Sequence, residues 1–593
     1  MVTGRLPFEG ETSIAIAMKH KSEAPQDPGK INTQIPDELS RVILRCLEKD
    51  KEKRYQSAGE VRSELENIEK GIPTTEKVIP KRKPITSKEI TVTIGLKKLL
   101  IPASIVLALV IGAYIIWQFL PQKEAVPTEP SKRTIAVLSF EDLSPEKDQE
   151  HFCDGLANSI INALSNIEDL SIRARSSSFL FKGKQRDLQE IAMKLNVEAV
   201  LEGTVQKMGN RFRITAQLIN IVDESVLWSD QYNRGEGDVF AIQDEITLAI
   251  VNKLRIELLG GKRAKLVKRY TENIEAFNLY SKGIISVNIR TVKDLQMAIQ
   301  YFEQAIEKDP GYALAYAGLA DARNLLTDYG YLSPNELYQE SLKAKEAALK
   351  ALEIDNTLAE AHTSLGKIKW LFDWDWDGAE RELTRAIELN PGYADARYSN
   401  AYFLMLMARF KEAIREMKLA FELDPLSLVI SRNLGQVFYR ARQYERAIEA
   451  LHETLEMDPN FTNTHRYLGL TYLAQSMYEV ALAEFQKEKE IRNGVDVFSD
   501  AMIIVIHALT GKNEKALQLL DVFLEQSKNI YIRPYLFAYI YTALGESDTA
   551  FKYLEKAYEE HDNYLRWIKA DPLFDDIRSD SRFKTLLKKM NLE

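Results

Sequence analysis

Four turn signals in the second half of the chain follow one another at a nearly constant spacing. Each pairs Asp or Asn with a proline, first at Pro310 and then at Pro391, Pro425 and Pro459. The last three prolines are equally spaced, with a period of about 34 residues. The segments between these signals have the apolar spacing of amphipathic helices. A fixed period of this length predicts a solenoid of stacked helix pairs, because an unrelated helical bundle has no reason to keep one period.

Small residues occur where the two helices of each unit must pack closely. They are Ala298 and Ala305, Ala379 and Ala386, Ala413 and Ala420, Ala516 and Ala550, with Gly366, Gly435 and Gly469 at the expected helix crossings. The period is that of the tetratricopeptide repeat. We predict seven to eight repeats over residues 273–593, one of them widened by an insertion at 324–339, with residues 567–592 as a terminal cap. Such an array predicts a protein or peptide partner.

An apolar stretch interrupts the first part of the chain. Residues 99–120 carry no charge over 22 positions, enough to span a bilayer of about 30 Å as a helix. Seven basic residues lie at 77–98, whereas three lie at 123–133. The positive-inside rule then places the N-terminus in the cytoplasm. We therefore expect a single-pass protein of the inner (cytoplasmic) membrane, with its C-terminal domains outside the cytoplasm.

Composition excludes several classes of site. The net charge of −9 is spread through a helix-rich second half, so we expect no nucleic-acid partner. The two cysteines, Cys46 and Cys153, would lie on opposite sides of the membrane and could not pair. His151, Cys153 and Asp154 lack the number and spacing of zinc ligands and are interpreted as cap and core residues. We expect no cofactor and no metal, and the oligomeric state stays open.

The first half divides by composition. Residues 1–70 show helical periodicity, 71–98 form a linker rich in Pro, Lys and Thr, and 121–133 form a second linker after the apolar stretch. Residues 134–260 alternate apolar strands with amphipathic helices and contain a hairpin that turns at Gly209 and Asn210. This pattern predicts a small α/β domain.

The segment 1–70 resembles the end of a bacterial Ser/Thr protein kinase C-lobe. The resemblance rests on "MVTGRLPFEG", with Gly4, Pro7 and Phe8, and on "CLEKDKEKRYQSAGEVRSEL", with Arg54. In that family the arginine at this position forms a buried ion pair with the glutamate that ends the activation segment, and no such glutamate precedes Arg54 here. The ATP-binding and catalytic loops of that family lie upstream, so the chain as given cannot transfer phosphate, and we expect the parent gene to encode a Ser/Thr kinase.

The α/β region resembles a second family, loosely related to the N-terminal domain of TolB, that precedes repeats in bacterial receptor kinases and adenylate-cyclase-like proteins. The resemblance rests on "IAVLSFEDLSPEKDQEHFCDGL" and on the long run from "RARSSSFLFKG" to "FAIQDEI". It implies no enzymatic activity and an unknown ligand.

Three tryptophans within one repeat, Trp370, Trp374 and Trp376, allow two interpretations. Tryptophans at this density could line a peptide groove, where aromatic side chains act as anchors. They could equally fill the space between the helices of a repeat, and we favour this packing role.

Together these features predict a multidomain, mainly α protein with a kinase C-lobe remnant, one transmembrane helix, a small α/β domain and an α-solenoid. We interpret it as the sensor or assembly part of a Ser/Thr receptor kinase, binding protein or peptide partners outside the cytoplasm. The alternative is a stand-alone scaffold whose kinase remnant is inert. A membrane-bound transcription regulator with a winged-helix head is disfavoured by "TGRLPFEG" and by the mixed charge of residues 1–70.

Overall fold

The computed structural model forms two compact units, Met1–Glu124 and Ala125–Glu593. The residues that it describes are 25, 27–32, 35–48, 53–55, 58–69, 132–183, 187–235, 239–254, 269–329, 332 and 334–592. In the first unit these residues form three helices, α2 (Pro28–Ile31), α3 (Asp37–Cys46) and α4 (Ala58–Glu69). Ser40 on α3 donates to Asp27, the residue that caps α2, over 2.7 Å and so joins these two helices.

No helix among the described residues combines the length and the apolar character that crossing a membrane requires. This finding overturns the localisation expected from the sequence, a single pass through the inner membrane with the C-terminal domains outside the cytoplasm. The apolar segment 99–120, on which that expectation rested, lies outside the described residues.

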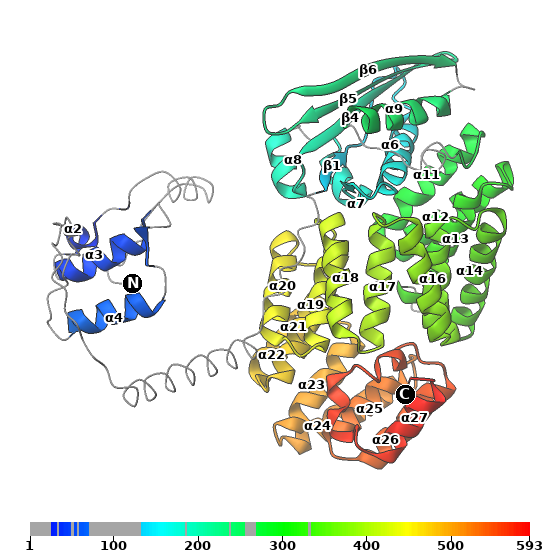
Figure 1. The fold of residues 1–593 in the computed structure, drawn as a ribbon. Coiled ribbons are helices and arrows are strands. Elements are labelled where there is room, and N and C mark those ends of the chain that lie inside the picture. The colour runs from blue at the N-terminus through cyan, green and yellow to red at the C-terminus, as the bar shows by residue number, and fades with distance from the viewer. Residues whose placement is uncertain are drawn as a thin grey trace, which may run out of the picture. The chain divides into compact units, whose positions relative to one another are not determined.

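The second unit begins with an α/β domain (Figure 1). Its strands are β1 (Arg133–Val137), β2 (Glu141–Asp142), β3 (Leu170–Ile172), β4 (Ala199–Met208), β5 (Arg211–Asn220) and β6 (Val226–Gly235). Its helices are α6 (Glu150–Ser165), α7 (Arg175–Ser178), the short η3 (Phe179–Phe181), α8 (Leu188–Leu195) and α9 (Val239–Lys253). The strand order is β3-β1-β4-β5-β6, with β2 beside β4.

The sheet is mixed, with both parallel and antiparallel pairs. β1 pairs in parallel with β3 and β4, whereas β4, β5 and β6 are antiparallel. The predicted hairpin turn is present, with Gly209 at φ +59° between β4 and β5. Side chains of β1 alternate between two cores: Ile135 and Val137 pack with α6 and α9, and Ala136 packs with α8 on the other face.

An array of paired helices follows the α/β domain (Figure 1). Eight pairs lie among the described residues, at the upper end of the predicted number. They are α11 (Ile274–Ile289) with α12 (Val292–Lys308), α13 (Ala313–Tyr329) with α14 (Pro334–Ile354), α15 (Ala359–Ile368) with α16 (Trp376–Leu389), α17 (Ala394–Leu406) with α18 (Phe410–Leu423), α19 (Leu428–Arg440) with α20 (Tyr444–Met457), α21 (Thr464–Ala474) with α22 (Tyr478–Ile491), α23 (Val497–Leu509) with α24 (Asn513–Gln526), and α25 (Pro534–Ala543) with α26 (Ser547–Glu559). A π-helical turn, η5 (Lys369–Asp373), precedes α16, and η6 (Leu565–Trp567), η7 (Pro572–Ile577) and α27 (Ser581–Lys589) end the chain.

The predicted small residues lie at the helix crossings. The side chains of Ala379, Ala413 and Ala516 are fully buried. At Gly435 an added Cβ would lie 2.5 Å from the side chain of Leu451, and at Gly469 it would lie 2.9 Å from the ring of Phe485. The two helices of a pair can approach this closely because no side chain separates them. The predicted insertion lengthens α13 and α14, which have 17 and 21 residues.

The α/β domain packs against the array through α6 and α11. Phe277 on α11 belongs to the core of the α/β domain and contacts Phe152, with ring centroids 5.9 Å apart. A second contact joins Ser165 at the end of α6 to the amide of Asn390, over 3.0 Å. A third joins the Ser177 hydroxyl to the backbone amide of Leu426, over 2.9 Å.

Gly155 allows α6 and α11 to meet, which gives a first prediction. An added Cβ would lie 2.3 Å from the Ser281 hydroxyl and 2.7 Å from the ring of Phe277. We expect Gly155→Ala to lower the free energy of unfolding by about 1–3 kcal/mol, because helix α6 or α11 must shift. Chemical denaturation followed by circular dichroism measures this loss. The control is Gly235→Ala, where nothing lies within 4 Å of the added Cβ. An equal effect of both substitutions would contradict the role of this contact.

Candidate functional site

Of the four residues named for the kinase motif, Arg54 lies among the described residues, whereas Gly4, Pro7 and Phe8 lie outside them. Arg54 is exposed, and its Nε donates to the backbone oxygen of Glu48 over 2.5 Å. Arg45 instead stacks over the Tyr55 ring at 4.2 Å, and Tyr55 donates to Glu64. The buried position that the arginine has in the kinase family is therefore not reproduced here.

The three tryptophans connect the third helix pair to the end of the chain. The ring of Trp374 lies 4.3 Å from that of His561 and 5.6 Å from that of Tyr558, between centroids. Nε1 of Trp376 donates to the backbone oxygen of Met590 over 2.6 Å. We call these contacts between the three tryptophans and the end of the chain the closure contact. It includes Trp370, whose ring lies 5.4 Å from the Arg566 guanidinium.

The closure contact gives all three tryptophans a packing role. They are 4%, 9% and 6% exposed, in the order Trp370, Trp374 and Trp376, so little of any ring is available to a partner. This burial agrees with the packing interpretation of these residues, although the space they fill lies between distant parts of the array. A partner groove at these rings stays a prediction.

The first helices of successive pairs contact one another and form one face of the array, which we call the first-helix face. Residues 565–577, the C-terminal segment, lie against it. Trp567 packs on Tyr402 of α17 with centroids 4.9 Å apart, and the Arg440 guanidinium of α19 lies 4.1 Å from the Trp567 ring. Every residue of α19 from Ile430 to Arg440 is buried between this segment and the neighbouring helices.

Asp571 is the main polar contact of the C-terminal segment. It is 1% exposed, lies 3.3 Å from a terminal nitrogen of Arg440, and accepts hydrogen bonds from the hydroxyls of Tyr535, at 3.2 Å, and Tyr539. Burial alone would lower the pKa of Arg440, but the Asp571 carboxylate outweighs it and the pKa is raised. Burial and then Asp571 raise the pKa values of Tyr535 and Tyr539. The first-helix face thus holds a buried carboxylate that is paired with one guanidinium and two hydroxyls.

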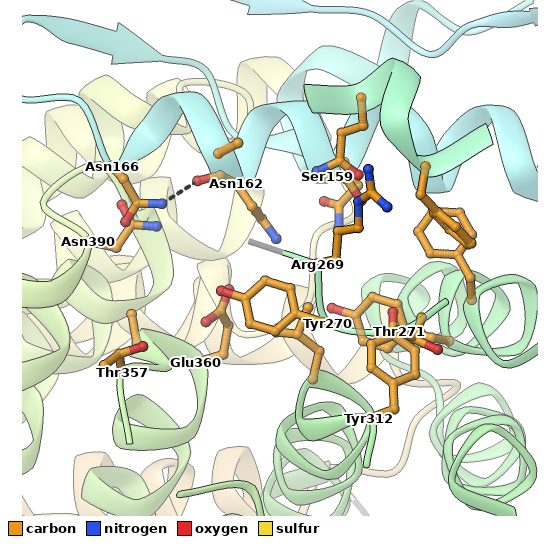
Figure 2. A pocket seen from close by; sticks show the side chains of 18 of the residues that line it. Ser159, Asn162, Asn166, Arg269, Tyr270, Thr271, Tyr312, Thr357, Glu360 and Asn390 are labelled. Carbon is orange, nitrogen blue, oxygen red and sulfur yellow. Dashed lines mark hydrogen bonds between the residues drawn. The ribbon is translucent and has the colours of Figure 1, made fainter. Parts of the chain in front are cut away.

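A pocket lies between the α/β domain and the array (Figure 2). One wall is a polar stripe of α6 with Asn158, Ser159 and Asn162, and the opposite wall is formed by the starts of α13 and α15. It contains about 810 Å³ of empty space, a figure that counts the open solvent at its mouth. The charged residues that line it are Arg269 and Glu360.

Sequence reasoning did not single out Asp571 or Glu360. Asp571 stands in an Asp-Pro pair within the predicted cap, which signals a turn and a helix start but not a partner as distant in the chain as Arg440. Glu360 is an ordinary acidic residue in the first turn of α15. A local pattern holds no signal for either role.

The comparisons with known proteins agree with this division of the chain. The family model described as FlgO protein matches residues 122–234, and two models described as tetratricopeptide repeat match residues 432–495 and 535–560. The resemblance of the α/β domain to TolB stays a prediction.

Two curated relatives are similar to parts of the chain. "Putative adenylate cyclase 3" of Rhizobium meliloti is 34% identical over 251 residues, 42% of this chain and 42% of that protein. "Probable serine/threonine-protein kinase" of Clostridium acetobutylicum is 44% identical over 68 residues, 12% of this chain and 10% of that protein. The chain therefore matches less than half the length of either relative.

Among solved structures, YrrB, a tetratricopeptide-repeat protein with an unusual peptide-binding site, is 22% identical, with a TM-score of 0.24 over 32% of this chain and 92% of YrrB. The chain thus contains tetratricopeptide repeats, a small sheet domain and a short stretch that is similar to a Ser/Thr kinase.

Proposed function

We propose that the array binds an extended acidic segment of a protein partner on its first-helix face. The observation that carries the proposal is the C-terminal segment itself, which occupies this face with Asp571 paired to Arg440, Tyr535 and Tyr539. The carboxylate forms an ion pair with the guanidinium and accepts charge-assisted hydrogen bonds from the two hydroxyls, which are stronger than neutral ones. A partner with similar chemistry would replace the chain's own segment.

The face also has unused donors of the same kind. Nε of Arg432 and Nε of Arg440 are buried and have no hydrogen-bond acceptor among the described residues. Burial raises the pKa of Tyr467. Three nearby guanidinium groups oppose that rise, those of Arg440, Arg432 and Arg466. Three guanidinium groups around one ring favour an acidic occupant over a basic one.

We further propose that the chain is the partner-binding part of a protein related to Ser/Thr kinases. The support is the short stretch that is 44% identical to a kinase, together with the resemblance of residues 1–70 to the end of a C-lobe. Mass spectrometry of the native protein tests this proposal. Peptides of a glycine-rich phosphate loop and a catalytic loop in the same polypeptide would support it, whereas a native polypeptide that begins at Met1 would favour the stand-alone scaffold.

A fluorescent peptide of residues 562–580 tests the binding proposal with the full chain. In the wild type the internal segment competes at a high effective concentration, so weak binding is expected. In Asp571→Asn the internal segment loses its charge, and we expect fluorescence anisotropy to show binding of the peptide at least about tenfold tighter. A peptide with asparagine in place of Asp571 is the control. Equal binding of the two peptides, or binding of neither, would contradict the proposal.

A further inference from the structure

Glu360 is the charged side chain of the interdomain pocket that lacks a countercharge. Arg269, the other charged residue of the lining, has its Nε 3.2 Å from Oδ2 of Asp244. Within the part of the chain that the structure describes, the Glu360 carboxylate has no side-chain hydrogen bond and no ion pair. Figure 2 shows Glu360 on the pocket wall beside Tyr270. A half-buried carboxylate with no countercharge attracts a cationic group.

The electrostatic surroundings agree with this geometry. Burial raises the pKa of Glu360, the hydrogen bond from its own backbone N–H lowers it in part, and Asp355 raises it further. No cationic group among the described residues opposes that rise. Burial and then Glu360 raise the pKa values of Tyr270 and Tyr280, which places both phenols near the carboxylate. Among the described residues, the titratable groups that interact with the Glu360 carboxylate are thus a second carboxylate, that of Asp355, and phenols, among them those of Tyr270 and Tyr280. None of them is cationic.

Aromatic rings form the rest of the surroundings. Tyr270, Tyr280 and Tyr312 line the pocket with Glu360. Tyr280 and Tyr312 are 6% and 1% exposed and pack on each other with ring centroids 5.2 Å apart, so the half-buried Tyr270 is the ring of the three that a ligand can contact. The faces of such rings attract ammonium groups through their quadrupole. A carboxylate next to an accessible aromatic ring is therefore chemically suited to an alkylammonium group. On the opposite wall, the described residues provide no hydrogen bond to the side chains of Asn158, Ser159 or Asn162, so these can bind polar groups on the rest of a ligand.

We propose that the interdomain pocket binds a small organic molecule through its ammonium group, with Glu360 as the anionic partner and the ring of Tyr270 beside it. The site lies outside the first-helix face and does not depend on the proposed binding of a protein partner. Because α6 and α15 form opposite walls, a bound molecule would connect the α/β domain to the array.

Small amines and their neutral analogues test the proposal on the full chain. The probes are ethanolamine and putrescine, which carry ammonium groups, and ethylene glycol and glucose, which do not. We expect the two amines, but not the neutral probes, to raise the melting temperature and to give saturable binding in calorimetry. Binding of glucose alone would indicate a sugar site and overturn the proposal, as would no binding of either amine.

The variant Glu360→Gln keeps the shape of the side chain and removes its charge. We expect it to bind the amines at least about tenfold more weakly, the loss typical of a charge-assisted hydrogen bond. Because it removes an uncompensated carboxylate, its own melting temperature should equal or exceed that of the wild type. The control is Glu353→Gln on α14, whose carboxylate is exposed and paired with Lys350. If Glu360→Gln did not fold, Tyr270→Leu would be expected to show the same loss; unchanged amine binding in either pocket variant would overturn the proposal.

Discussion

Replacing Asp571 by alanine is expected to lower the free energy of unfolding by about 3–5 kcal/mol, the range found when one partner of a buried ion pair is removed. The substitution leaves the Arg440 guanidinium, which is 5% exposed, without its carboxylate. It also removes the acceptor of two tyrosine hydroxyls and the N-cap of η7. Chemical denaturation of the full chain measures the loss.

The control for Asp571 is a second aspartate that also pairs with an arginine. Asp548 lies 2.8 Å from Arg582, but its side chain is 85% exposed. We expect Asp548→Ala to change the free energy of unfolding by less than about 0.5 kcal/mol, since water screens the pair. Equal losses for the two variants would show that Asp571 does not hold the C-terminal segment in place.

Replacing Trp374 by alanine is expected to destabilise the protein by about 3–5 kcal/mol and to act at two distant places. Trp374 is 9% exposed and packs on Tyr558 and His561, which belong to the far end of the array. In a simple solenoid each repeat contacts only its neighbours, so a local loss would stay local. Because of the closure contact, amide exchange should become faster in residues 556–567 as well as around η5.

Leu349→Ala, at a position that is 49% exposed on α14, is the control for that experiment. It should leave exchange in residues 556–567 unchanged. Faster exchange around η5 alone in Trp374→Ala would mean that the array does not close in solution.

The sequence by itself predicted the elements and their order. Apolar periodicity, turn residues and the constant spacing of the prolines are local properties, and each is enough to specify a helix, a strand or a repeat. The alanines and glycines at the crossings, such as Ala413 and Gly435, could also be predicted, because two close-packed helices require a small residue at a fixed position in every unit. The β4–β5 hairpin followed from its turn residues for the same reason.

Only the tertiary structure decided which distant residues meet. Each repeat is rotated slightly relative to the one before it, and these rotations accumulate along the array. Local sequence patterns do not specify them, yet they bring Trp376 to Met590, 214 residues later. The same accumulation brings Asp571 to Arg440, and the docking of α6 on α11 makes Glu360 part of a pocket. The three tryptophans show the difference: their number in one repeat was visible in the sequence, but the surface they bury belongs to the other end of the chain.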